Sequence, residues 1–163
     1  MRKDNRGFSL VELVVVVLIM AIIAVAVSAA IIKWVNNSRN STDVQTKNTI
    51  RDNVALSLTN EEAFKEVMHG GYEIHITKND SGVITYTYVG DVDAAGKPIA
   101  TNPYWSFLLE TTGCNDYDEF EKRFTIKSDP PVGQNISINV TVYDNGFTYV
   151  TLDGIENEDL DLS

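Results

Sequence analysis

Residues 7–32 read GFSLVELVVVVLIMAIIAVAVSAAII, and the run from Leu13 to Ile32 contains no charged side chain. A helix rises about 1.5 Å per residue, so this run spans the hydrocarbon core of a bilayer, which is about 30 Å thick. The first seven residues carry three basic side chains and one acidic one. Because basic residues stay on the cytoplasmic side, the sequence predicts a cytoplasmic N-terminus, a single membrane span and an extracytoplasmic remainder.

The chain beyond this run is acidic. The whole sequence of 163 residues has 13 Lys and Arg against 23 Asp and Glu, a net charge of −10. Sequence-independent binding of nucleic acid requires basic side chains that release counterions from phosphates, so no nucleic-acid partner is expected. A hydrophobic fraction of 44% is enough to build a core. The length suits one modest domain.

Three interpretations of the N-terminus differ in what they make of Glu12. In a secretory signal peptide, Leu13–Ile23 is the apolar region and Ala24-Val25-Ala26 the cleavage site. In a simple anchor, the whole run stays in the membrane. Neither interpretation uses a carboxylate beside an apolar helix, where it costs about 3 kcal/mol. The third interpretation gives Glu12 a function, and its alternative is a side chain tolerated at the membrane interface.

The segment Gly7-Phe8-Ser9-Leu10-Val11-Glu12-Leu13, followed by the apolar run, resembles the start of type IV prepilins and pseudopilins. In that family a prepilin peptidase cleaves after the glycine of a short basic leader, on the cytoplasmic side. The new first residue is usually an N-methylated phenylalanine, and the fifth is glutamate. The resemblance therefore implies cleavage between Gly7 and Phe8, methylation of Phe8 and an assembly role for Glu12.

The resemblance also implies a function, a location and partners. The function is that of a structural, non-enzymatic subunit that leaves the plasma membrane for an extracellular helical filament of identical copies. The partners are the prepilin peptidase, an assembly ATPase and an inner-membrane platform protein. Many Gram-negative pilins have a proline in this helix and this sequence has none, so a Gram-positive pilin, a pseudopilin and a competence pilin all remain open. The competing function is a secreted or membrane-anchored adhesin or binding domain.

In such a filament Glu12 is expected to pair with an amine. Cleavage would give Phe8 an α-amino group, which is cationic at neutral pH. If this amine meets Glu12 of a neighbouring subunit, two charges are neutralised together. The net stabilisation of such a pair is small when desolvation cancels the Coulomb energy. Its main effect is on register, as with a single polar residue in a coiled-coil core.

The residue patterns predict four parts, and the resemblance implies that the first is cleaved and that the second forms the filament core. They are a cleaved leader (1–7), a transmembrane and filament-core helix (8–33), an amphipathic continuation (34–58) and a globular head with an acidic tail (59–163). Residues 36–42 are poor helix formers, so the sequence predicts one long helix over 9–58 with a soft segment there, and a break remains the alternative. The apolar positions that predict its buried face are Val44, Ile50, Val54 and Leu58.

The head is expected to be α+β, with an antiparallel sheet packed on the long helix, as in pilins. Alternation at 72–76 and 84–88 around the turn 79–82 predicts one hairpin, and alternation at 136–142 before Asp144-Asn145-Gly146 predicts another. Thr59 and Glu62 fit a capping box that starts a helix ending at Met68. The other expected elements are helices at 104–110 and 116–123 and a strand at 124–127.

The head offers little chemistry for catalysis or metal binding. Its histidines, His69 and His75, and the single Cys114 lack zinc spacing, and no nucleophile elbow or phosphate-binding motif is present. No enzymatic activity or cofactor is therefore expected, and Cys114 is expected to be a buried thiol. Tyr104 and Trp105 are expected in the core, with an adhesive role at the surface as the alternative. Calcium remains an alternative at the acidic tail, although such tails are usually only solvated. The candidate ligands are Asp153, Glu156, Glu158, Asp159 and Asp161.

Overall fold

The computed structural model describes residues 9–155 and divides the chain into two units, before and after the step from Ser38 to Arg39. Helix α1, Leu10–Ser57, contributes to both units. In the first unit, every side chain of α1 from Leu10 to Trp34 is exposed. This part of α1 is long and apolar enough to cross a membrane. The predicted long helix is confirmed.

The segment 36–42 is helical throughout, although its residues are poor helix formers. Two of the polar side chains that lie in or next to it bond to a distant loop and not to the local backbone. The Oδ1 atom of Asn40 accepts a hydrogen bond from the Ser128 hydroxyl at 2.8 Å, and Asp43 binds the backbone of the same loop. Tertiary contacts therefore override the weak helix propensity of this segment.

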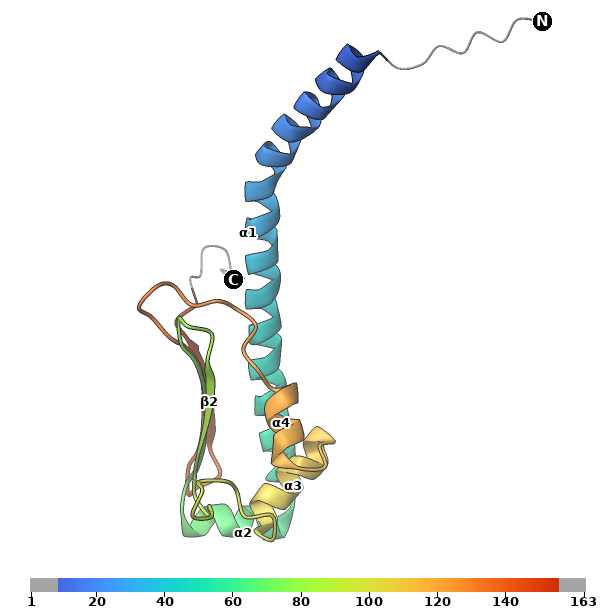
Figure 1. Cartoon of the computed structure of the whole chain (residues 1–163). Helices are drawn as coiled ribbons and strands as arrows, with labels where there is room; N and C mark the ends of the chain where they lie inside the picture. Colours follow the sequence, from blue (N-terminus) through green and yellow to red (C-terminus); the bar gives the residue numbers. More distant parts are fainter. Residues whose placement is uncertain (1–8, 156–163) are drawn as a thin grey trace, which may run out of the picture. The chain divides into compact units, whose positions relative to one another are not determined.

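The second unit contains a four-stranded antiparallel sheet with the order β2-β1-β3-β4. Its strands are β1 (Tyr72–Lys78), β2 (Ile84–Val89), β3 (Ile136–Val142) and β4 (Thr148–Asp153). Both predicted hairpins are confirmed, and β1 and β3 join them in the middle, with Ile74 opposite Val140. The central strands alternate buried and half-buried residues, so one face of the sheet is covered. Within this unit the other helical segments lie along that face, and the helix at 61–69 lies across one end of the sheet (Figure 1).

Three shorter helices complete the second unit: α2 (Glu61–His69), α3 (Pro103–Thr112) and α4 (Tyr117–Arg123). The predicted capping box of α2 is wrong by one residue. The Oδ1 atom of Asn60 accepts hydrogen bonds from the backbone N–H groups of Glu62 at 2.8 Å and Ala63 at 3.2 Å. The Thr59 hydroxyl instead donates to the Leu56 carbonyl at 2.7 Å, within the end of α1.

The predicted strand at 124–127 is also wrong. Phe124 and Ile126 are buried and alternate with more exposed neighbours, as strand residues do, but the segment joins no ladder. The backbone N–H of Lys127 donates to a side-chain oxygen of Asp43 at 2.7 Å. The alternation of buried and more exposed residues in this segment therefore comes from an extended loop that packs on the core, and not from a strand.

Aromatic side chains dominate the core of the second unit. Trp105 is fully buried, and its ring meets those of Tyr88 and Tyr117 edge to face, both at 5.9 Å between centroids. Its indole N–H donates to the Asp91 carbonyl at 2.8 Å. The core positions predicted for Tyr104, Trp105 and Cys114 are confirmed.

The predicted buried face of α1 is confirmed at its centre. Ile50 and Val54 are fully buried, whereas Val44 and Leu58 are half-buried. Asp43, which the apolar spacing did not include, is buried beside Val44. The helix thus presents a carboxylate as well as apolar side chains to the rest of its unit.

Candidate functional site

Glu12 lies at the start of α1, where no other charged residue occurs between Leu10 and Ile32. Its Oε2 atom accepts a hydrogen bond from the backbone N–H of Ser9 at 2.9 Å, and the Ser9 hydroxyl oxygen accepts one from the backbone N–H of Val11 at 3.3 Å. The two bonds form a variant of the capping box in which the serine hydroxyl binds the N–H of the second helical residue and not that of the third. The carboxylate therefore satisfies a free donor at a helix N-terminus, where negative charge is also favoured.

This local role of Glu12 was not predicted from the sequence. The signal was present, because Ser9-Leu10-Val11-Glu12 has the serine-x-x-glutamate spacing of a capping box. Glu12 would therefore also be useful in a simple anchor, because a cap stabilises any helix. Gly7 and Phe8, predicted to flank the cleaved bond, lie outside the described residues.

A second cluster fixes the loop at residues 127–129 to α1. Asp43 has no exposed surface, and its two oxygens accept hydrogen bonds from the backbone N–H groups of Lys127 at 2.7 Å and Ser128 at 2.8 Å. Hydrogen bonds to an ionised carboxylate are about twice as strong as neutral ones. No local pattern could reveal this contact, because the partners are 84 and 85 residues apart in the chain.

Charged side chains also connect the loop at residues 127–129 to the sheet. Lys78, at the end of β1, is nearly buried and donates to the Ser128 carbonyl at 2.7 Å and to Asp129 at 2.8 Å. Arg39 forms an ion pair with the other oxygen of Asp129. The hydrogen bond from Lys78 lowers the pKa of the Asp129 carboxyl, and the charges of Lys78 and Arg39 act in the same direction. The arrangement is that of a structural clamp between helix, loop and strand.

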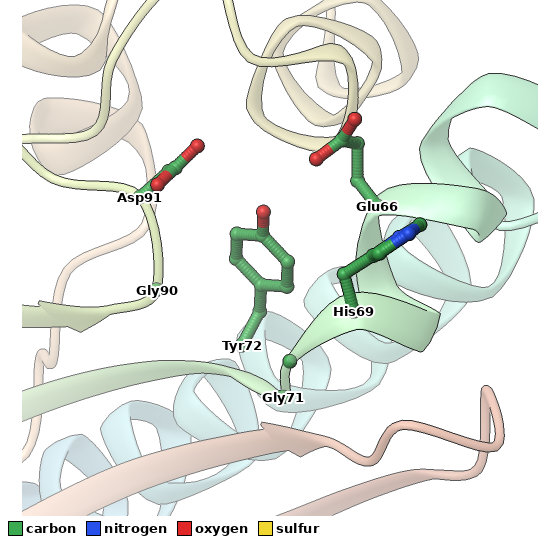
Figure 2. A pocket seen from close by; sticks show the side chains of 7 residues that line it. Glu66, His69, Gly71, Tyr72, Gly90 and Asp91 are labelled. Carbon is green, nitrogen blue, oxygen red and sulfur yellow. The ribbon is translucent and has the colours of Figure 1, made fainter.

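A cavity of about 470 Å³ lies at the opposite end of β1. It is lined by Glu66, His69, Gly70, Gly71, Tyr72, Gly90 and Asp91. Figure 2 shows the hydroxyl of Tyr72 between the carboxylates of Glu66 and Asp91. Gly90 has a φ of +124°, and a Cβ there would lie 2.4 Å from the Tyr72 ring. Only glycine therefore permits this close approach of the chain after β2 to the tyrosine.

The polar groups of this cavity are largely engaged with one another. The side-chain amide of Asn102 donates to the Tyr72 hydroxyl at 2.9 Å and to Asp91 at 3.1 Å. Burial raises the pKa of Tyr72, and the charges of Asp91 and Glu66 raise it further, so the phenol is neutral at pH 7. Nδ1 of His69 lies 2.6 Å from the Lys65 carbonyl oxygen. These contacts hold the end of the sheet together and supply no activated nucleophile.

Candidate metal ligands are dispersed in the part of the chain that the structure describes. Asp153 is engaged, because its Oδ2 atom accepts hydrogen bonds from Asn139 and Thr151, both at 3.0 Å. The two ring nitrogens of His75 lie 2.9 Å from side-chain oxygens of Asn139 and Glu73, whereas Nδ1 of His69 lies beside the Lys65 carbonyl. Between residues 9 and 155, no three His, Cys, Asp or Glu side chains are placed to share a metal ion. The remaining calcium candidates, Glu156, Glu158, Asp159 and Asp161, lie outside the described residues.

Comparison with known proteins identifies the N-terminus. Residues 2–28 match a family model described as the prokaryotic N-terminal methylation motif, which is the class III signal peptide of type IV pilins. No curated protein and no solved structure matches the chain. The motif supports a precursor of the type IV pilin or pseudopilin kind and points to a structural subunit. The long helix and antiparallel sheet have the α+β architecture of pilins.

Proposed function

We propose that this protein is the structural subunit of a type IV pilus-like filament and polymerises through the start of α1. One observation carries the proposal: the methylation motif at 2–28 overlaps a helix whose side chains are all exposed from Leu10 to Trp34. Apart from Glu12 and Lys33, none of these side chains is charged. An apolar surface of this extent requires lipid or other copies of the same helix.

The parts of the chain act one after another during insertion, cleavage, methylation and assembly. The precursor inserts with its basic leader (1–7) in the cytoplasm, and a prepilin peptidase cleaves between Gly7 and Phe8. Phe8 is then N-methylated. An assembly ATPase and a membrane platform protein move the helix 8–33 from lipid into the filament core. The amphipathic continuation 34–58 and the head 59–163 lie outside the membrane.

Glu12 sets the register in this scheme. Apolar helices that leave lipid for a filament core exchange one dry environment for another, so burial alone does not select one alignment. The amine of Phe8 on an entering subunit pairs with Glu12 of a subunit already in place. In a misaligned helix the amine and the carboxylate do not meet, so each charge stays unpaired in an apolar environment. This cost disfavours misaligned packing.

The N-terminal sequence and intact mass of the protein, purified from its own cells, test this proposal. We expect a chain that begins at Phe8 and carries one added methyl group, because the motif predicts both processing steps. A chain that begins near Val27 would identify an ordinary signal peptide and overturn the filament. An intact Met1 would equally overturn it and leave a membrane-anchored domain.

A further inference from the structure

We propose that the globular heads of successive subunits touch end to end, with Val132 of one copy inserted into a pocket beside Met68 of the next copy. This inference rests on the proposed function and deepens it, because it names surfaces through which copies of this chain meet outside the apolar helix. Both surfaces belong to the unit from Arg39 onward.

Val132 lies in a tight turn of the loop before β3. Its side chain is 96% exposed, more than any other large apolar side chain between residues 9 and 155. The Gln134 N–H donates to the Pro131 carbonyl at 3.0 Å, and Gly133, at the third position of the turn, has a φ of +76°, which favours glycine. The Gly133 N–H also donates to the Asp80 carboxylate at 3.0 Å. These bonds hold an apolar side chain out into solvent.

A pocket of about 470 Å³ is lined by residues from α2, β1, β2 and the end of β3. Its exposed apolar side chains are those of Met68, Val89 and Tyr143, which are 58%, 45% and 47% exposed. Apolar walls with a few polar groups are typical of sites that bind a partner. The pocket therefore suits an aliphatic side chain presented by another molecule.

The turn and the pocket lie at opposite ends of the sheet. The loop that carries the turn is bound at the end of β1, where Lys78 donates to the Ser128 carbonyl, whereas the pocket is lined by Gly71 and Val142, at the start of β1 and the end of β3. Figure 1 shows this loop (orange) and α2 at the two ends of the sheet. Seven strand residues span about 20 Å, so Val132 does not reach the pocket of its own chain. A contact between two different surfaces of identical copies repeats in one direction and builds an open filament.

Charge favours a second copy as the occupant. Glu73 and Asp144 line the pocket, and no Lys or Arg does. The carboxylate of Asp144 and the ammonium group of Lys127, in the loop that leads to the turn, have no partner among the described residues. The Asp129 carboxylate of that loop is already paired within its own chain. An end-to-end contact brings the unpaired ammonium of one copy to the end of the sheet that carries the unpaired carboxylate of the next.

The contact is weak by itself. Stable interfaces bury about 1,200 Å² or more, and a single turn covers much less. It therefore acts only together with the packing of the apolar helices, which holds the copies at high effective concentration. Heads that lack this helix are expected to stay monomeric.

Disulfide cross-linking of filaments from the native cells tests the contact. Val132→Cys and Met68→Cys are combined in the full-length chain, so that each copy carries one cysteine at each surface. We expect oxidation to produce a ladder of covalent oligomers, because a disulfide forms only between residues that lie next to each other. The control combines Val132→Cys with Ser106→Cys, which is exposed on α3, and should give no ladder. The native Cys114 is buried and common to both pairs. Equal ladders in the two pairs, or none in either, would overturn the contact.

Filament yield tests its effect on assembly. We expect Val132→Asp to lower the yield several-fold and Val132→Ile to preserve it. Val83→Asp is the matched control, because Val83 lies between β1 and β2 and is 57% exposed, and it should give the wild-type yield. Lys127→Glu should also lower the yield, and Asp144→Lys in the same chain should restore it. A wild-type yield in Val132→Asp would contradict the contact, and a failure of the reversed pair to restore assembly would contradict the charge pairing.

The wild-type protein separates the two proposals. Filaments of chains that begin at Phe8, but without a ladder in the Val132 and Met68 pair, would overturn the contact and leave the proposed function in place. A chain that begins near Val27 and forms no filaments would overturn the proposed function, and this inference with it.

Discussion

Asp43 is a carboxylate with no exposed surface, in a helix that the sequence pattern describes as amphipathic. Burial of an ionised group is costly unless its oxygens are satisfied. Both oxygens of Asp43 accept backbone N–H groups, from Lys127 and Ser128. The residue therefore attaches a loop of the head to α1, and its removal would leave two N–H groups without an acceptor.

We expect Asp43→Ala to lower the free energy of unfolding by about 3 kcal/mol, because it removes two charge-assisted hydrogen bonds from a buried site. Denaturant unfolding of the full chain in detergent micelles, followed by near-ultraviolet circular dichroism, measures the change. Asp52→Ala is the control on the same helix, since Asp52 is 69% exposed and pairs only with the adjacent Arg51 among the described residues. Its expected cost is below about 0.5 kcal/mol. Equal costs for the two variants would argue against the clamp.

Glu12 and Asp43 differ in how far the sequence could reveal them. The bonds of Glu12 are local, so both its place in the pilin-type motif and its capping box with Ser9 can be identified from neighbouring residues. The bonds of Asp43 depend on a loop more than 80 residues away. Nothing in the segment around Asp43 indicates that contact, and its acidic side chain instead suggests an exposed position.

At the scale of secondary-structure elements, the errors of prediction occur where one element ends against another. Thr59 and Glu62 match a capping box, but the Thr59 hydroxyl binds the Leu56 carbonyl at the end of α1, and Asn60 caps α2 in its place. The two hairpins were predictable because their alternation and their turns are local. The segment 124–127 was not, because its backbone finds a partner on α1.

The N-cap of α2 gives a second stability prediction. We expect Asn60→Ala to cost about 1 kcal/mol, as for other N-cap residues, because the N–H groups of Glu62 and Ala63 lose their acceptor. Thr59→Ala should cost less, since it removes one hydroxyl donor from an exposed helix end. Denaturant midpoints of the two variants decide the order. A larger effect at Thr59 would favour the capping box expected from the sequence.

At the scale of the whole molecule, the chain separates exposed apolar surface from packed core. Within residues 9–155, every buried side chain lies at Asp43 or beyond it. The apolar part of α1 before Ser38 belongs to the other unit, in which every side chain from Leu10 to Trp34 is exposed. The unit from Arg39 onward therefore contains its own core, its sheet and the clamp of Arg39, Asp43, Lys78 and Asp129.

We expect a chain that begins at Asn36 to be a soluble, folded monomer, because it keeps the core and the clamp and lacks the apolar run. Size-exclusion chromatography and near-ultraviolet circular dichroism in the absence of detergent test this. The near-ultraviolet spectrum should show the packed environment of Trp105, and unfolding should be cooperative. Aggregation, or a spectrum typical of an unpacked core, would mean that the head depends on the N-terminal part of α1.

The strand order also determines the order in which the contacts of the sheet form during folding. Each hairpin pairs strands that are adjacent in the chain, but the central pair joins Tyr72 to Val142 across the whole of α3 and α4. Contacts that close long loops form late, because the intervening chain must first lose its freedom. A nascent chain that ends at α4 therefore leaves one edge of β1 unpaired. Such edges pair readily with other chains, so the protein is most vulnerable to aggregation in the interval before β3 has been synthesised.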